Sequence, residues 1–266
     1  MLEISNERIY GLEESIVASG YPMLSKSYTN GEFEDKSTDI NSIIFFDGGS
    51  ETDLTWADKR IKTAKNLGNT PLGEGHSNYL KGIVVQFDVR YPVYWTPQFQ
   101  RYNFADIVSS MSSMHRITKM NLDESFNEYV LAQVKDEIIS LINIYNVALS
   151  KGIKKIWKKT LIDKKYNRTS RIYFSIEKQK KILEEIDEEK LMFGEKDEEI
   201  SIEDLYMHII SSCPQGLEKT MRVSTNYLQL KTIYLQRKNH KLKDWKVFCD
   251  WCLTLPYFKE LCLGDK

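Results

Sequence analysis

The densest group of polar side chains able to do chemistry lies between Gly73 and Arg116. Within it, Gln98 and Arg101 are three residues apart, so they would share one face of a helix. An amide and a guanidinium together suit the recognition of a planar base and a phosphate. The same pattern also describes a helix with a solvated polar face, and the sequence leaves both interpretations open. A serine cluster and a basic pair follow: Ser109, Ser110, Ser112, Ser113, His115 and Arg116.

A second group lies in the C-terminal third, where the apolar pattern predicts a long helix over residues 217–237. Asn226 and Arg237 are eleven residues apart in this segment, which is close to three helical turns. Both side chains would therefore project toward the same side and could serve one binding site. The alternative is again a surface helix with solvated polar residues.

Together these two regions resemble the flavin-dependent thymidylate synthases. That family has a glycine and a histidine before a buried strand, and then a glutamine three residues ahead of an Arg-His-Arg core. Further along, it has a proline, an asparagine twelve residues later, an arginine eleven residues after that, and a tryptophan. The matching residues here are Gly75, His76, Gln98, Arg101, Pro214, Asn226, Arg237 and Trp245, and the segment from Tyr145 to Gly152 matches a further family motif.

The chain also departs from the family pattern. Tyr102 and Asn103 stand where the family has the histidine and second arginine of its core. Gly82 stands in place of a histidine near the flavin. Ile210 replaces a phosphate-binding arginine, and Cys213 replaces a leucine before the proline.

The resemblance implies a helix-rich α+β fold, built as a single domain around a small, mainly antiparallel sheet and assembled as a homotetramer. It implies that reduced FAD supplies hydride, and a reduced folate the one-carbon unit, to a pyrimidine deoxynucleotide such as dUMP. Arg237 would be the catalytic residue, stabilising negative charge that develops on a pyrimidine carbonyl. The residues implied for the nucleotide are Gln98, Arg101, Ser113 and Arg237, and those for the flavin are His76, Arg101 and Asn226.

Two other functions fit the same residues. The first is a catalytically inactive relative that binds a nucleotide or a protein partner. The second is a structural protein with neither ligand, in which both polar faces are solvated. The lost arginine position at Ile210 and the missing His-Arg pair favour the catalytically inactive relative.

The periodicity of apolar residues predicts helices around a small sheet. The expected strands are residues 43–46 and 83–93, separated from the helices by turn residues. The expected helices are residues 6–20, 53–67, 97–112, 124–150, 203–212, 217–237 and 243–254. Residues 153–200 are rich in lysine and glutamate, so we expect a charged helical insertion that is either solvated or bound to a partner.

Composition narrows the class of protein. The 37 basic side chains are balanced by 38 acidic ones, which argues against a general nucleic-acid-binding protein. No apolar run approaches the roughly 18 residues of a transmembrane helix, so we expect no membrane association. The four cysteines of this 266-residue chain indicate a reducing compartment, and we expect a cytoplasmic protein. Cys249 and Cys252 have the spacing of a redox or metal pair, but their apolar neighbours favour a buried helix face and no metal site.

Overall fold

A computed structural model describes residues 2–23, 61–163, 168–174 and 196–264 of the chain. The chain divides into two compact units, Met1–Ser110 with Lys219–Lys266, and Met111–Glu218. The predicted strand at residues 43–46 and the first part of the predicted helix at 53–67 lie outside the described residues. Residues 61–68 are helical, in agreement with the prediction for that part. Whether the two units fold as one cooperative domain stays a prediction.

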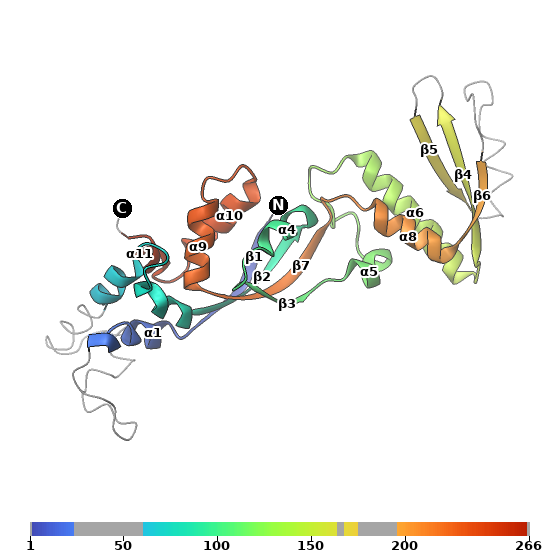
Figure 1. Ribbon diagram of the computed structural model, residues 1–266. Helices are drawn as coiled ribbons and strands as arrows, with labels where there is room; N and C mark the ends of the chain where they lie inside the picture. Colours follow the sequence, from blue (N-terminus) through green and yellow to red (C-terminus); the bar gives the residue numbers. More distant parts are fainter. Residues whose placement is uncertain (1, 24–60, 164–167, 175–195, 265–266) are drawn as a thin grey trace. The chain divides into compact units, whose positions relative to one another are not determined.

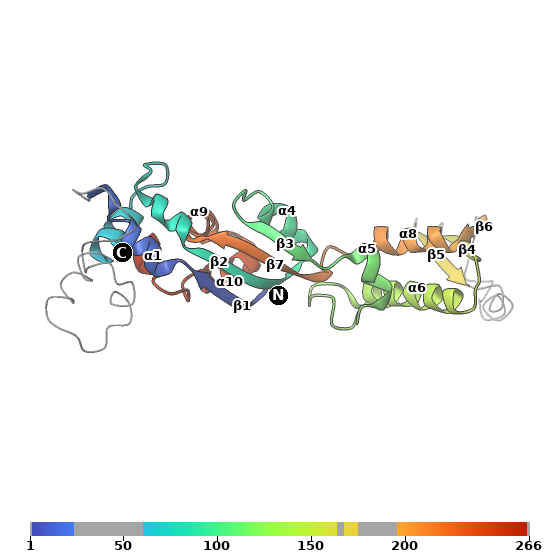
Figure 2. The ribbon, with the colours of Figure 1, turned by 90° about the horizontal axis from the view of Figure 1, so that it is seen from below.

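The first unit contains a four-stranded sheet of order β1-β2-β7-β3, whose strands lie next to one another in Figure 2. Its strands are β1 (Glu3–Tyr10), β2 (Val84–Pro92), β3 (Asp106–Ser110) and β7 (Glu218–Asn226). The β1–β2 and β3–β7 pairs are antiparallel. β2 confirms the predicted strand, because Val85, Phe87 and Val89 are buried and alternate with half-buried polar residues.

The predicted helix at residues 6–20 is wrong in its first half. β1 occupies that half and pairs with β2 from Glu3 to Tyr10, so long-range hydrogen bonding overrides the local helical pattern. The helix is the shorter α1 (Leu12–Ala18), which buries Leu12, Ile16 and Val17 as predicted. Gly11 joins strand and helix with a φ of 69°, where a Cβ would lie 2.6 Å from the carbonyl oxygen of Gly82.

Two other predicted helices contain a strand instead. In residues 97–112, helix α4 (Thr96–Phe99) ends early and β3 follows. In residues 217–237, the first half is β7 and only the second half is helix, α9 (Tyr227–Arg237). β7 buries Met221, Val223 and Thr225 on one face, so its buried residues alternate as in a strand. The helical pattern of the residues that follow was extended over this segment in the prediction.

A bulge in β1 and three hydrogen bonds beside it join β1, β2 and β7. β1 carries a bulge between Ser5 and Arg8, within which Asn6 has a φ of 54°. The Asn6 amide donates to Oδ2 of Asp88 on β2 at 2.8 Å, and Nη1 of Arg222 on β7 donates to the Asn6 carbonyl at 2.9 Å. Arg222 also bonds to Oδ1 of Asp88 at 3.1 Å. The hydrogen bonds from Asn6 and Arg222 lower the pKa of Asp88. This hydrogen-bond network across three strands therefore holds a charged carboxylate.

The core of the first unit is aromatic. Helices α9, α10 (Lys243–Cys252) and α11 (Phe258–Cys262) pack with the sheet (Figure 1), and α10 confirms the prediction at 243–254. The ring centroid of Phe87 on β2 lies 4.5 Å from that of Trp251 on α10. Cys249 and Cys252 are buried on α10, as predicted, and burial raises the pKa of the Cys249 thiol to about 11.

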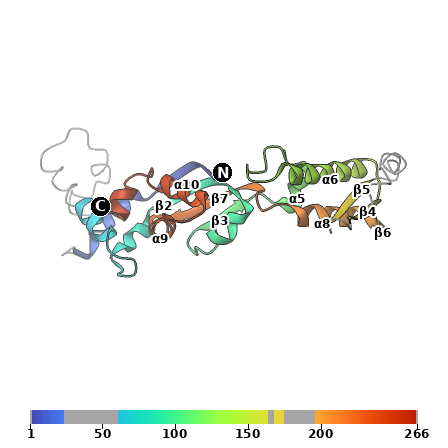
Figure 3. The same ribbon diagram turned by 90° about the horizontal axis from the view of Figure 1, so that it is seen from above.

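The second unit pairs helix α6 (Ala132–Ser150) with helix α8 (Ile202–Ser212), which lie side by side in Figure 3. α8 matches its prediction, whereas α6 begins eight residues later than predicted. At one end is a three-stranded antiparallel sheet of order β5-β4-β6. Its strands are β4 (Lys155–Asp163), β5 (Arg168–Phe174) and β6 (Lys196–Ser201).

The predicted charged helical insertion is therefore wrong in its secondary structure. The described part of residues 153–200 is mainly strand. Its β-branched residues Ile156, Thr160 and Ile162 favour a strand, whereas the many lysines around them suggested a charged helix. Its ends lie next to each other, since the Ile202 amide donates to the Lys154 carbonyl at 3.0 Å. Within the described part of the chain, no helix has the length and apolarity needed to cross a membrane.

We predict that this three-stranded segment can be removed without loss of the α6–α8 pair. Replacing residues 155–200 by a short Gly/Ser linker keeps Ser201, whose Oγ accepts from the Asp204 amide at 3.0 Å and begins α8. The change also removes buried Ile156 and Ile200, so some stability is lost along with the segment. The expected result is a soluble protein with a cooperative thermal transition, measured by circular dichroism. An insoluble product, or a transition without cooperativity, would show that the segment belongs to the core.

Candidate functional site

A chain of hydrogen bonds joins the end of α9 to the turn after α4. Nε of Arg237, the last residue of α9, donates to the Tyr102 hydroxyl at 2.7 Å. The Tyr102 hydroxyl in turn donates to Oε1 of Gln236 at 3.2 Å. A phenol can accept one bond and donate another, so both functions of Tyr102 are used and its position is fixed from two sides.

The guanidinium of Arg237 also lies over aromatic rings. Its Cζ is 4.8 Å from the ring centroid of Trp245 on α10 and 5.6 Å from that of Tyr102. Both distances are within the range of an attractive cation–π contact. The terminal nitrogens of Arg237 bond to no described residue, so the fork that can grip a carbonyl or a phosphate is available.

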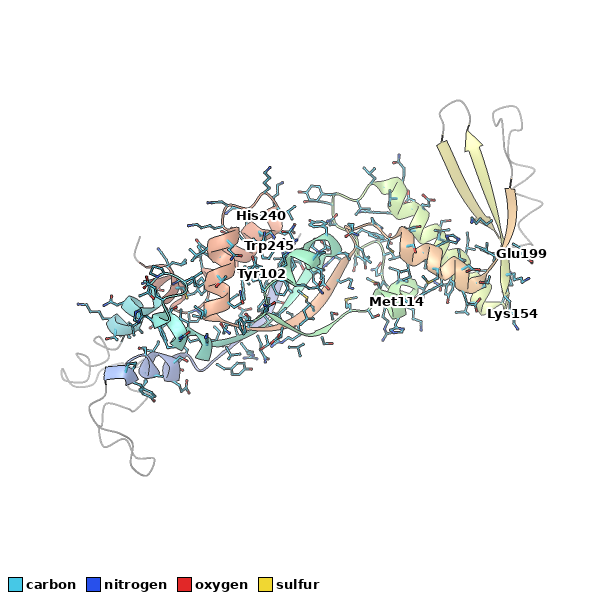
Figure 4. The ribbon with its side chains drawn as sticks, viewed as in Figure 1. Tyr102, Met114, Lys154, Glu199, His240 and Trp245 are labelled. Carbon is cyan, nitrogen blue, oxygen red and sulfur yellow. The ribbon has the colours of Figure 1, made fainter. Side chains whose placement is uncertain are left out.

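Gln98 lies on the other side of this contact network. The indole Nε1 of Trp245 donates to the Gln98 Oε1 at 2.8 Å. Trp245 itself is fully buried, with ring contacts to Trp95 at 4.8 Å and Phe248 at 5.7 Å. The core therefore holds the indole in place, and the indole positions both Gln98 and Arg237. Figure 4 shows Trp245 beside Tyr102 and His240.

His240 completes the group three residues after Arg237. Its Nδ1 accepts from the Leu242 amide at 3.1 Å, so the ring is neutral with its remaining proton on Nε2. Partial burial and the nearby charge of Arg237 lower the pKa of His240. Its ring meets Trp245 in an edge-on contact of 6.3 Å. His240 therefore adds a donor to the site without adding charge at neutral pH.

Among the described residues, no carboxylate contacts Arg237, Gln98 or His240. The nearest acid in sequence, Asp244, is buried and its oxygens are already used by the Leu2 amide at 3.1 Å and the Tyr94 hydroxyl at 2.8 Å. Three donors bond to no described residue: the terminal nitrogens of Arg237, the amide nitrogen of Gln98 and the Nε2 proton of His240. A ligand that satisfies them has to be rich in acceptors, such as carbonyl oxygens or a phosphate.

The structure brings together two of the residues predicted from the sequence, Arg237 and Gln98, around Trp245. The prediction that Gln98 and Arg101 share a helical face is wrong, because α4 ends at Phe99. Arg101 is exposed in the turn between α4 and Tyr102.

Asn226 lies apart from this group at the start of α9. The expected single helix carrying Asn226 and Arg237 is wrong, since Asn226 is the residue that caps α9 and Arg237 is at its other end. Its Oδ1 accepts from the Gln229 amide at 2.9 Å, which satisfies one of the open donors of the helix. Asn226 therefore has a structural role as the cap of α9, and its amide nitrogen bonds to no described residue.

His76 and Ser113 each begin a short helical segment. His76 is exposed at the start of η3 (His76–Gly82), directly after Gly75 with a φ of 81°. η3 packs against α9, and the Tyr227 amide donates to the Ile83 carbonyl at 3.0 Å, so this segment adjoins the Asn226 end of α9. Ser113 is half-buried at the start of α5 (Ser113–Arg116), which belongs to the second unit.

Sequence reasoning missed the contribution of Tyr102, Gln236 and His240. Tyr102 was visible only as a departure from the family pattern, and its hydroxyl contact with Arg237 spans 135 residues. Gln236 and His240 flank Arg237 in the sequence, but a polar residue next to an arginine carries no specific signal. Only the fold shows that they belong to one network.

The chain as a whole has a fold similar to that of solved structures. Two of them are thymidylate synthase X (ThyX) from Helicobacter pylori with FAD and dUMP. One has a TM-score of 0.53 at 13% identity over 100% of this chain and 98% of that chain. The other has 0.52 at 14% identity over 99% and 98%. No family model and no curated protein matches the sequence, so the likeness establishes a shared fold.

We predict that Tyr102→Phe destabilises the protein by about 1 kcal/mol, because it leaves Arg237 Nε and Gln236 Oε1 without their shared partner. Urea unfolding measures the change. Tyr10→Phe is the matched control, since Tyr10 is an exposed tyrosine of the same unit and should give no measurable effect. Equal stability of Tyr102→Phe and wild type would mean that water replaces the hydroxyl in this network.

We predict a second effect for His240, on the pH dependence of stability. The folded protein lowers the His240 pKa from its ordinary value of 6.5, so the unfolded chain takes up the proton first. The neutral ring contributes fully to the free energy of unfolding above about pH 6.5, and this contribution is lost as the pH falls below that value. His240→Asn keeps an acceptor for the Leu242 amide and does not titrate. Chemical unfolding between pH 5 and 8 should show a shallower fall of stability for this variant, and identical slopes would contradict the assignment.

Proposed function

We propose that this protein carries out an FAD-dependent modification, a methylation or related one-carbon transfer, of a pyrimidine deoxynucleotide such as dUMP. The observation that carries the proposal is the guanidinium of Arg237, held by Tyr102 at 2.7 Å and over Trp245 at 4.8 Å, with its terminal nitrogens open. A uracil ring presents carbonyl oxygens as acceptors, and the fold likeness is to proteins solved with FAD and dUMP. Donor chemistry and fold thus point to the same substrate class.

In this proposal Arg237 is the catalytic residue. Its fixed positive fork faces the pyrimidine and stabilises negative charge on a carbonyl oxygen as the ring is activated. Nothing in the side chain has to move to do so, since the hydroxyl of Tyr102 and the indole of Trp245 already hold it. Gln98 adds a neutral donor to the same ligand. The nucleotide phosphate would meet exposed Arg101.

The residues assigned to FAD offer donors of the right chemistry. His76 and Arg101 are exposed, and neither bonds to a described residue, so both can meet an anionic pyrophosphate. Asn226 keeps an amide nitrogen for the ring system after capping α9. When bound, reduced FAD supplies hydride to the pyrimidine, with a reduced folate as the source of the one-carbon unit. The proposal includes a homotetramer in which subunits share sites.

A second function is favoured by two specific observations. Tyr102 and Asn103 occupy the positions of the family His-Arg pair, and the Tyr102 hydroxyl is fully used within the protein. The carbonyl of Asn226 is used as well, in capping α9. A catalytically inactive relative would bind the nucleotide or a protein partner without binding a flavin. It would therefore need neither the His-Arg pair nor a free Asn226 carbonyl. Such a protein would be colourless after purification and would still bind dUMP.

We predict that Arg237→Lys weakens dUMP binding by about 1.5–3 kcal/mol while the fold is kept, because lysine cannot reproduce the planar fork. Calorimetric titration measures the affinity. Arg8→Lys is the matched control, an exposed arginine of β1 away from the site, and should bind as the wild type does. Flavin absorbance of the purified protein then separates the enzyme from the inactive relative. Equal dUMP affinities for wild type and Arg237→Lys would remove Arg237 from the site.

A further inference from the structure

Two buried indole N–H groups have no hydrogen-bonding role in the first unit. In the described part of the chain, the buried side-chain nitrogen and oxygen atoms without a hydrogen-bond partner are Nε1 of Trp95 and Nε1 of Trp251. An unpaired donor in a protein interior costs stability, because it loses the water that it bonds in the unfolded chain. Phenylalanine would fill much of the same space without this cost. Packing alone therefore does not account for tryptophan at these two positions.

Both indoles belong to a row of aromatic rings, which we call the ring row: Trp251, Phe248, Trp95, Trp245 and Tyr102. The ring centroid of Phe248 lies 5.4 Å from that of Trp251 and 5.9 Å from that of Trp95. The centroid of Trp245 lies 4.8 Å from that of Trp95 and 6.0 Å from that of Tyr102. The row therefore begins at half-buried Trp251, passes through fully buried rings and ends in the candidate site.

The surroundings of the inner indoles suit them to passing on an electron vacancy. An indole ring readily loses one electron, and its N–H group then becomes strongly acidic. Among the described residues Trp95 has no acceptor for this proton, and Trp245 Nε1 faces, at 2.8 Å, only the very weakly basic amide oxygen of Gln98. Both oxidised indoles therefore keep their protons, and the vacancy is trapped on neither. The guanidinium of Arg237, 4.8 Å from the Trp245 centroid, further opposes a resting positive charge there.

Tyr102 is the ring on which the vacancy comes to rest. Its hydroxyl donates to Oε1 of exposed Gln236 at 3.2 Å, so the phenol proton has a way to solvent. Nε of Arg237 donates to the same hydroxyl oxygen at 2.7 Å and stabilises it once the proton has left. The product is a neutral radical, which the positive guanidinium does not repel. Tyr91 also lies 6.1 Å from Trp95, but burial raises the pKa of its hydroxyl and disfavours loss of its proton.

We propose that the ring row is a relay for single-electron transfer between the protein surface at Trp251 and the candidate site at Tyr102. A one-electron oxidant at the surface takes an electron from Trp251, and electrons from the inner rings refill each vacancy in turn. The net change is the loss of one electron by Tyr102, cleavage of its O–H bond, release of the proton to water and reduction of the oxidant. In reverse, a one-electron reductant at the surface, such as ascorbate, restores Tyr102 with a proton from water. Such a path suits the proposed flavin chemistry, which includes one-electron steps, and it needs no bound ligand to operate.

The test starts the oxidation at one end of the relay in the ligand-free protein. A ruthenium photosensitiser is attached to Asp250→Cys, an exposed position beside Trp251. The background is Cys213→Ser, in which the remaining native cysteines are buried. A flash of light with an external electron acceptor turns the label into a one-electron oxidant. We expect a tyrosyl radical, detected by transient absorbance and electron paramagnetic resonance, and circular dichroism checks that each variant is folded.

Tyr102→Phe should abolish the tyrosyl signal and leave an oxidised tryptophan in its place. Tyr91→Phe is the matched control, a buried tyrosine at the side of the row, and should keep the signal. Trp95→Phe should abolish the signal because it removes the oxidisable ring between Trp251 and Trp245, and Trp251→Phe serves if Trp95→Phe does not fold. A wild type without a tyrosyl radical, or a signal that survives Tyr102→Phe or the folded tryptophan variant, would overturn the relay. Since neither nucleotide nor flavin is present, such a result would leave the proposed function standing.

Discussion

The buried indole of Trp245 is the element on which the candidate site depends. Its faces and edges are packed by the aromatic core, and its one polar atom is bonded to Gln98 at 2.8 Å. The same ring carries the guanidinium of Arg237 at 4.8 Å. A flexible arginine and a flexible amide thus take their positions from the most rigid part of the unit. Preorganised donors of this kind need no rearrangement when charge develops on a bound ligand.

Tyr102 holds Arg237 from a second direction. Its hydroxyl accepts a hydrogen bond from Arg237 and donates one to Gln236. Arg237 is thereby held at Nε as well as by the ring of Trp245, and its terminal nitrogens bond to no described residue.

The parts of the fold predicted correctly are those with local signals. β2 shows its alternation of Val85, Phe87 and Val89, and α8 and α10 show clear helical patterns. β1, β3 and β7 were mistaken for helix because their pairing partners are distant in the sequence, as for Asp106 with Ser224. At the site, the spacings that paired Gln98 with Arg101 and Arg237 with Asn226 on single helices were wrong, because α4 ends at Phe99 and α9 begins only after Asn226. The contacts of the Tyr102 hydroxyl and the His240 ring come from tertiary structure, which no local pattern reveals.

The hydrogen-bond network of Asn6, Asp88 and Arg222 joins parts of the chain that are far apart in the sequence. Its members are separated by 82, 134 and 216 positions, so the contact is among the most non-local in the first unit. The backbone pairing of β1 with β2 needs only residues up to 90, whereas the side-chain contacts around the bulge also need Arg222 of β7. The bulge of β1 therefore depends on a residue more than two hundred positions further along the chain, and a protein truncated before β7 would lack that contact.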